Sequence, residues 1–136
     1  MAYILVADDD EILAEMVRHR LATVGHEVVV VEDGEEALQC VGKRLPDAIL
    51  LDWMMPVRSG MDTLVELKSH PTRCHVPVVM MTSRRSQADV LTALRAGASD
   101  YMTKPFSPED LALRIEGLLE RKRYVADDGG LRQSLH

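Results

Sequence analysis

Residues 48–52, Ala48-Ile49-Leu50-Leu51-Asp52, decide the fold, because a short apolar run stops there directly at an acidic side chain. Other short runs of the chain also stop at a side chain that can ionise or form hydrogen bonds. They are residues 3–7 with Asp8 and Asp9, residues 78–81 with Thr82, and residues 101–103 with Lys104. Runs of this length, separated by stretches of helical periodicity, are typical of strands buried in a parallel sheet.

The stretches between the runs predict helices with recognisable ends. Candidate N-caps are Asp10, Asp33, Ser86 and Ser107, and candidate glycines past a helix end are Gly25 and Gly97. Two more strands are expected at residues 28–31 and at about residues 99–102. Five strands that alternate with five helices predict an α/β fold with a doubly wound, five-stranded parallel sheet.

Composition limits the class of protein. The chain has 136 residues, enough for one domain with a real core, and a formal net charge of −6. This acidic balance argues against direct binding of nucleic acid. No secretory leader and no apolar run of roughly 18 residues is evident, so we expect no membrane association and a cytoplasmic location. Cys40 and Cys74 lack the spacing of a metal or redox motif, so we expect reduced thiols.

The helical pattern stops after about Tyr124, where the polar stretch Asp127-Asp128-Gly129-Gly130 follows. We therefore expect a folded domain at residues 1–123. Residues 124–136 are predicted to form a flexible tail or the start of a linker to an absent effector domain. A stand-alone domain is the alternative.

The polar side chains at the strand ends predict a site. Strands of an open parallel sheet present their carboxyl ends at one edge, so Asp8, Asp9, Asp52, Thr82 and Lys104 are expected to meet in one crevice. Carboxylates with no histidine or cysteine nearby favour Mg²⁺, and a cation allows adjacent acids to stay ionised. A lysine and a hydroxyl suit a phosphoryl group, and an aspartate can act as the nucleophile.

Four blocks of sequence occur in order: residues 4–11, residues 51–56 with Gly60, residues 81–83, and residues 97–106. Together they resemble the receiver domain of two-component response regulators. The resemblance covers Ala2 to about Arg123 and implies a flavodoxin-like fold. It also implies a signalling domain that catalyses only its own phosphorylation and dephosphorylation.

The resemblance implies a role for each acid. Asp52 is expected to accept a phosphoryl group from a phosphohistidine of a sensor histidine kinase or a phosphotransfer protein. Asp9 and Asp52 are expected to bind Mg²⁺ directly, together with the backbone carbonyl of Met54. Asp8 is expected to bind the ion directly or through water.

The remaining residues of the motif are expected to turn phosphorylation into a signal. Lys104 pairs with the Asp52 carboxylate or a phosphoryl oxygen, and the Lys104-Pro105 bond resembles the cis peptide of the family. Thr82 bonds the phosphoryl group, and Tyr101 turns inward as Thr82 vacates space. The resemblance implies that the switched surface comprises the fourth helix, the fifth strand and the fifth helix.

The same surface is a candidate dimer face. Asp100, Asp110 and Arg114 match charged positions that winged-helix regulators of this family use in a symmetric homodimer, and Arg95 is expected to contribute. Val90 departs from the pattern, because those regulators usually carry a basic residue there.

Two positions near the site bear on the lifetime of the phosphoryl group. Met54 lies two residues after Asp52, and Arg84 lies two residues after Thr82. Neither offers a carboxylate or amide that would orient an attacking water, so we expect slow autodephosphorylation.

Two other classes of function stay open on sequence alone. A magnesium-dependent phosphatase of the haloacid-dehalogenase type also uses an aspartate at a strand end, but typically carries a second aspartate two residues later, where this chain has Met54. A phosphorylation-independent interaction module would usually lack one of the acids or Lys104, and all are present.

Overall fold

The computed structural model describes the backbone of residues 1–135 and the side chains of residues 1–121. Five parallel strands form one sheet in the order β2-β1-β3-β4-β5. The strands are β1 (Tyr3–Ala7), β2 (Glu27–Val31), β3 (Ala48–Asp52), β4 (Val78–Thr82) and β5 (Asp100–Thr103). The helices are α1 (Glu11–Thr23), α2 (Gly34–Lys43), α3 (Gly60–Lys68), α4 (Gln87–Arg95) and α5 (Pro108–Leu135). The predicted doubly wound α/β fold is confirmed.

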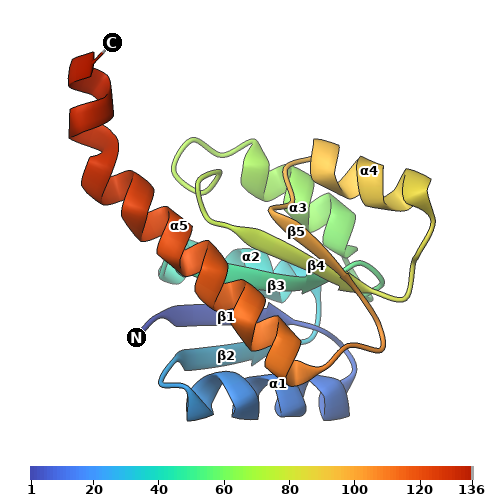
Figure 1. The fold of residues 1–136 in the computed structure, drawn as a ribbon. Coiled ribbons are helices and arrows are strands. Elements are labelled where there is room, and N and C mark those ends of the chain that lie inside the picture. The colour runs from blue at the N-terminus through green and yellow to red at the C-terminus, as the bar shows by residue number, and fades with distance from the viewer. Residues whose placement is uncertain (136) are drawn as a thin grey trace.

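The helices cover both faces of the sheet (Figure 1). One face packs against α1 and α5, and the other packs against α2, α3 and α4. Because both faces are covered, the central strands β1, β3 and β4 are buried along their whole length. This double burial explains why these strands are apolar without alternation in the sequence.

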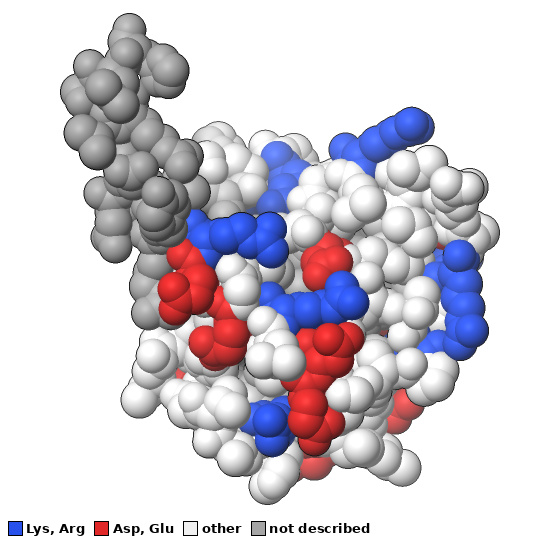
Figure 2. Space-filling model, in the orientation of Figure 1, with Lys and Arg blue, Asp and Glu red and all other residues white. Residues whose placement is uncertain are grey.

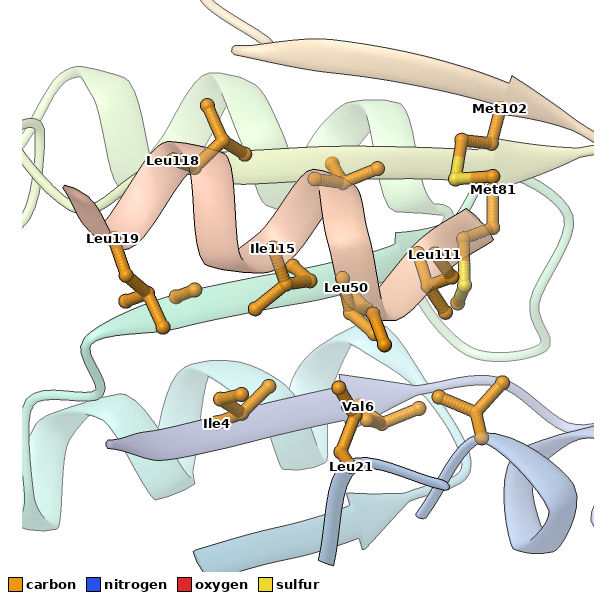
Figure 3. Packing of buried hydrophobic residues seen from close by; sticks show 14 residues of the cluster. Ile4, Val6, Leu21, Leu50, Met81, Met102, Leu111, Ile115, Leu118 and Leu119 are labelled. Carbon is orange, nitrogen blue, oxygen red and sulfur yellow. The ribbon is translucent and has the colours of Figure 1, made fainter. Parts of the chain in front are cut away.

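Alternate residues of each strand enter different cores. Ile4 and Val6 of β1 point toward α1 and α5, whereas Leu5 and Ala7 point toward the opposite layer. Figure 3 shows how α5 lies on the first of these cores, with Ile115 over the sheet. Ile115 is fully buried, and burial of a side chain of this size stabilises a fold by about 1.5–3 kcal/mol.

The predicted helix caps are confirmed. The side chains of Asp10, Asp33, Ser86 and Ser107 accept hydrogen bonds from backbone amides three residues later, at 3.1, 2.8, 3.1 and 3.0 Å. Gly25 and Gly97 adopt φ angles of 100° and 112°, which other residues rarely adopt. The sequence analysis identified no cap for α3, and the structure shows that Ser59 caps it by accepting from the Asp62 amide.

Several large apolar residues of the helices lie at the surface. In α1 the buried face comprises Ala14, Val17 and Leu21, so Met16 is 51% exposed on the other side. In α4 only Ala93 is buried, and Leu91 and Leu94 are each 41% exposed. Periodicity identified these helices correctly, but it did not show how narrow the face covered by the sheet would be.

The chain enters and leaves at the same end of the sheet. Figure 1 shows β1 starting at the left, whereas α5 starts at the right, crosses the sheet and extends past its left edge. The helical pattern of the sequence stops after about Tyr124, whereas α5 continues to Leu135. The side chains of residues 122–136 are outside the described part, so the boundary after residue 123 stays a prediction.

No helix within the described residues is long and apolar enough to span a membrane. On the face that carries α1 and α5, acidic and basic side chains are interspersed (Figure 2).

Candidate functional site

Three carboxylates gather at the carboxyl edge of the sheet. Asp8 follows β1 directly, and Asp52 is the last residue of the neighbouring strand β3. Carboxylate oxygens of Asp8, Asp9 and Asp52 lie within 4.8 Å of one another. Asp8 and Asp52 are buried, with exposed fractions of 1% and 5%, whereas Asp9 is exposed. The predicted convergence of the three acids is therefore present in the structure.

Lys104 neutralises part of this charge. Its Nζ lies 2.9 Å from Oδ2 of Asp8 and 3.3 Å from Oδ2 of Asp52. The backbone amide of Lys104 donates to the carbonyl of Thr82 at 2.8 Å, which fixes the lysine at the end of β4. The peptide bond between Lys104 and Pro105 is cis, as the family resemblance implied.

The cluster of three carboxylates holds more negative charge than Lys104 can balance. Burial raises the pKa of Asp52 to about 6, the charge of Asp8 raises it too, and Lys104 acts in the opposite direction. Burial lowers the pKa of Lys104, but its contacts with Asp8 and Asp52 outweigh burial, so that this pKa is raised overall. A divalent cation would stabilise the ionised carboxylates, and an all-oxygen donor set suits a hard cation such as Mg²⁺.

The loop after Asp52 is held close to the sheet. The amide of Met54 donates to Oδ1 of Asp52 at 3.4 Å, and the Met54 side chain is 56% exposed. Gly60 starts α3 directly behind the loop, where a Cβ atom would lie 2.0 Å from the Asp52 carbonyl oxygen. Only glycine fits this position without displacing the backbone that carries Asp52.

Thr82 and Tyr101 both form hydrogen bonds with Arg84. Thr82 is fully buried, and its Oγ1 accepts from the Arg84 amide at 3.2 Å. Tyr101 is half-buried, and its hydroxyl donates to the Arg84 carbonyl at 2.8 Å. The inward movement expected of Tyr101 involves a second state and stays a prediction.

The side chain of Arg84 reaches across to the end of β3. Its guanidinium lies over the Trp53 ring, 4.9 Å from the centroid, and its Nη1 lies 3.4 Å from Oδ2 of Asp89 in α4. Sequence reasoning named Arg84 only as a flanking residue and did not identify Trp53 or Asp89 as its partners. No motif spacing indicates these contacts, because they depend on the path of the loop between β4 and α4.

Comparison with known proteins now identifies the family. The chain matches the model of the response regulator receiver domain over residues 4–116. The chain belongs to this family. This receiver domain is 41% identical over 118 residues to the phosphate regulon transcriptional regulatory protein PhoB of Escherichia coli. The aligned region covers 87% of this chain and 52% of PhoB. It is 38% identical over 127 residues to the probable transcriptional regulatory protein TcrX of Mycobacterium tuberculosis. That aligned region covers 93% of this chain and 53% of TcrX.

Solved structures agree. A response regulator from Chloroflexus aurantiacus superimposes with a TM-score of 0.83 at 35% identity, covering 88% of this chain and 98% of that one. The chemotaxis response regulator CheY4 of Vibrio cholerae gives a TM-score of 0.82 at 31% identity, covering 87% and 98%. The receiver domain spans about half the length of the curated relatives, 52% of PhoB and 53% of TcrX. The family and the flavodoxin-like fold expected from the sequence are confirmed, and the domain is a signalling domain.

The charged residues of the candidate dimer face lie together. Arg114 of the receiver domain pairs with Asp100 at 3.1 Å and with Asp110 at 3.4 Å, all within one chain. Val90 lines the adjacent groove with Tyr101 and other residues of β5 and α5. Arg95 is exposed at the end of α4. Whether these pairs exchange between two copies stays a prediction.

Proposed function

We propose that Asp52 of this receiver domain accepts a phosphoryl group from a phosphohistidine of a sensor histidine kinase or a phosphotransfer protein. The observation that supports this proposal most directly is the cluster of Asp8, Asp9 and Asp52 with Lys104 in contact with two of the acids. A carboxylate oxygen of Asp52 attacks phosphorus, the phosphorus–nitrogen bond breaks, and the electron pair stays on the imidazole nitrogen, which takes up a proton. The product is an aspartyl phosphate.

The acid cluster fits Mg²⁺. Asp8, Asp9 and Asp52 would hold the ion, together with the Met54 carbonyl that the family resemblance implies. When bound, Mg²⁺ neutralises charge on the carboxylates and on the phosphoryl oxygens.

Two further side chains support the transfer. The Lys104 ammonium lies within hydrogen-bond distance of Asp52, so it is placed to pair with a phosphoryl oxygen on that carboxylate. The Thr82 hydroxyl, buried beside the site, is placed to donate to another such oxygen. In-line phosphoryl transfer depends mainly on such positioning and charge stabilisation.

We place the phosphodonor on α1, which starts three residues after Asp8. On its exposed face Ile12 is 77% exposed and Met16 is 51% exposed, and they line a groove with Glu11, Glu15 and His19. Exposed apolar side chains beside a reactive carboxylate are suited to a partner that must present its phosphohistidine there. The cytoplasmic location expected from the sequence belongs to this proposal.

The output surface is proposed to be α4, β5 and α5, which carry Tyr101 and the paired Arg114. A homodimer through this face is part of the proposal. Leu91 and Leu94 of α4, each 41% exposed, supply apolar area for such a contact.

Incubation with acetyl phosphate and Mg²⁺ tests the phosphoacceptor. We expect one acid-stable, base-labile phosphoryl group on the wild-type protein and none on Asp52→Asn. Labelling of Asp52→Asn at the wild-type level would contradict the proposal. Multiple turnover of small phosphoesters would favour the phosphatase alternative, and failure to bind beryllofluoride in Mg²⁺ would favour the interaction module.

Phosphotransfer from a histidine kinase tests the docking face. Ile12→Asp should slow transfer from the kinase at least tenfold and leave labelling by acetyl phosphate unchanged, because only the protein donor needs α1. Leu113→Asp is the matched control, since Leu113 is 72% exposed on α5. Equal effects of the two substitutions would contradict docking on α1.

A further inference from the structure

Arg84 contacts four other residues through its backbone amide, its backbone carbonyl and its guanidinium group. Its amide donates to Thr82 Oγ1, and its carbonyl accepts from the Tyr101 hydroxyl, at 3.2 and 2.8 Å. Its guanidinium stacks over Trp53 and pairs with Asp89. The residue therefore touches the ends of β3 and β4, the middle of β5 and the first turn of α4.

The two side-chain partners of Arg84 belong to different parts of the fold. Trp53 directly follows Asp52 and packs against the core beneath α3 and α4. Asp89 lies in the first turn of α4, where its amide donates to the Ser86 cap at 3.1 Å. A change in the position of Arg84 must therefore change a contact at the start of α4.

We propose that Arg84 is a positioning residue that transmits phosphorylation of Asp52 from Thr82 to the first turn of α4 through its pair with Asp89. This inference rests on the proposed function of Asp52. It assigns the transmission to the side chain of Arg84 as well as to the backbone of the loop. Trp53 is the surface against which the guanidinium is held in the unphosphorylated state.

Hydrogen bonding supplies the first step. The Thr82 hydroxyl is buried and bonded to the Arg84 amide. If this hydroxyl moves toward a phosphoryl oxygen on Asp52, the amide must follow it or lose this hydrogen bond, and the loss costs free energy. The backbone of residue 84 is therefore expected to move with Thr82, and the acceptor of the Tyr101 hydroxyl moves with it.

Charge supplies the second step. The Arg84 guanidinium contacts the face of the Trp53 ring, and its Nη1 lies 3.4 Å from Oδ2 of Asp89. The Arg84 side chain is 41% exposed. A contact of this kind is weak and easily replaced. A phosphoryl group at Asp52 carries close to two negative charges, so it competes with Asp89 for the guanidinium. Loss of the pair frees the first turn of α4.

Two measurements report on the two ends of this link. Hydrogen exchange of backbone amides at residues 87–91 reports on the first turn of α4. The emission of Trp53 reports on the stacked guanidinium, because Trp53 is the one tryptophan of the chain. Beryllofluoride with Mg²⁺ serves as the stable mimic of the phosphoryl group.

Arg84→Ala removes the link and keeps the backbone contacts. Without beryllofluoride, we expect exchange at residues 87–91 to be about fivefold faster than in the wild type, since a weak ion pair and a stacking contact are lost. In the wild type, beryllofluoride should produce a similar increase. In Arg84→Ala it should add little. Arg44→Ala is the matched control, because Arg44 also pairs with a carboxylate, Glu27, and stacks on an aromatic ring, Tyr3, but lies outside α4; it should keep the wild-type response.

Conservative variants separate transmission from simple packing. Arg84→Lys keeps a cation for Asp89 but loses the planar stack, so it should restore the α4 response while Trp53 emission stays altered. Amide exchange at residues 87–91 should be as fast in Asp89→Ala as in Arg84→Ala. Exchange in the double variant should be no faster than in either single variant.

Each outcome has a distinct meaning. Failure of the wild type to bind beryllofluoride overturns the proposed function and, with it, the transmission. Binding with an equal α4 response in the wild type and in Arg84→Ala overturns the role of Arg84 alone. Additive effects of Arg84→Ala and Asp89→Ala overturn the pairing as the route.

Discussion

The ammonium group of Lys104 donates to Asp8 at 2.9 Å, although the two residues are 96 positions apart in the chain. Its contact with Asp52 is longer, at 3.3 Å. Lys104 thus bridges the ends of β1 and β3 and links the two buried carboxylates.

Removal of this bridge should destabilise the protein. Lys104→Met leaves two buried carboxylates without their cation, so the free energy of unfolding at pH 8 in EDTA should fall by about 1–3 kcal/mol. Urea titration measures the change. Lys43→Met, at the exposed end of α2, is the control and should change the stability by less than about 0.5 kcal/mol. Equal stabilities of the two variants would contradict the bridge.

Ionisation of Asp52 should lower stability as the pH rises. Its pKa is about 6 in the folded protein against 3.8 for a free side chain, so the folded state keeps a proton that the unfolded state releases. Without metal, the free energy of unfolding should fall between about pH 4 and pH 6, by about 1–3 kcal/mol relative to Asp52→Asn. Urea titrations of both proteins across this range in EDTA measure the difference. Parallel pH profiles would show that Asp52 does not titrate in this window.

Magnesium should bind through Asp9 and not through its neighbour Asp10. Asp9→Asn should weaken Mg²⁺ binding at least tenfold, because one carboxylate of the cluster is lost. Asp10 caps α1 through Oδ1, and asparagine caps a helix equally well, so Asp10→Asn is a matched control. Titration of Trp53 emission with Mg²⁺ measures both affinities. A similar loss in both variants would indicate a general charge effect.

The phosphoryl group should be long-lived, with a half-life of many minutes or more. Met54 is exposed beside Asp52 and cannot orient water, so Met54→Asn should shorten the half-life several-fold by supplying an amide. Loss of label from acetyl-phosphate-treated protein measures the rate. Val57→Asn, on the same loop at a φ of 67° that asparagine tolerates, should have little effect. A wild-type half-life of seconds would contradict this expectation.

Gly60 should not tolerate a side chain. A Cβ atom would lie 2.0 Å from the Asp52 carbonyl oxygen, so Gly60→Ala should cost about 2 kcal/mol or more and slow phosphorylation by acetyl phosphate. Gly117 lies in α5 with nothing within 4 Å of its added Cβ atom. Gly117→Ala should therefore stabilise the protein by about 0.5–1 kcal/mol. Thermal unfolding compares the two, and similar melting temperatures would contradict the close approach.

The strands and the acid cluster were predictable because local rules govern them. Buried parallel strands leave apolar runs in the sequence, and the carboxyl ends of these runs lie at one edge by topology, which brings Asp8 to Asp52. The caps were predictable for the same reason, since each involves a side chain and an amide three residues later.

The contacts of Arg84 and the exposure of Leu91 and Leu94 were not predictable. The contacts depend on the path of the loop after β4, and the exposure depends on the distance between α4 and the sheet. Hydrophobic periodicity and motif spacing predict neither of them. Two neighbouring glycines, Gly129 and Gly130, are typical of a turn, but α5 includes both of them.

The course of α5 has a practical consequence. Because this helix starts soon after Lys104 and runs back across the sheet, the start of β1 and the end of α5 lie on the side of the sheet remote from the acid cluster (Figure 1). A surface anchor or a fluorescent dye attached at residue 1 or at the end of α5 would leave the acid cluster and α1 accessible to a phosphodonor. Immobilised protein is therefore suitable for direct kinetic measurement of partner binding.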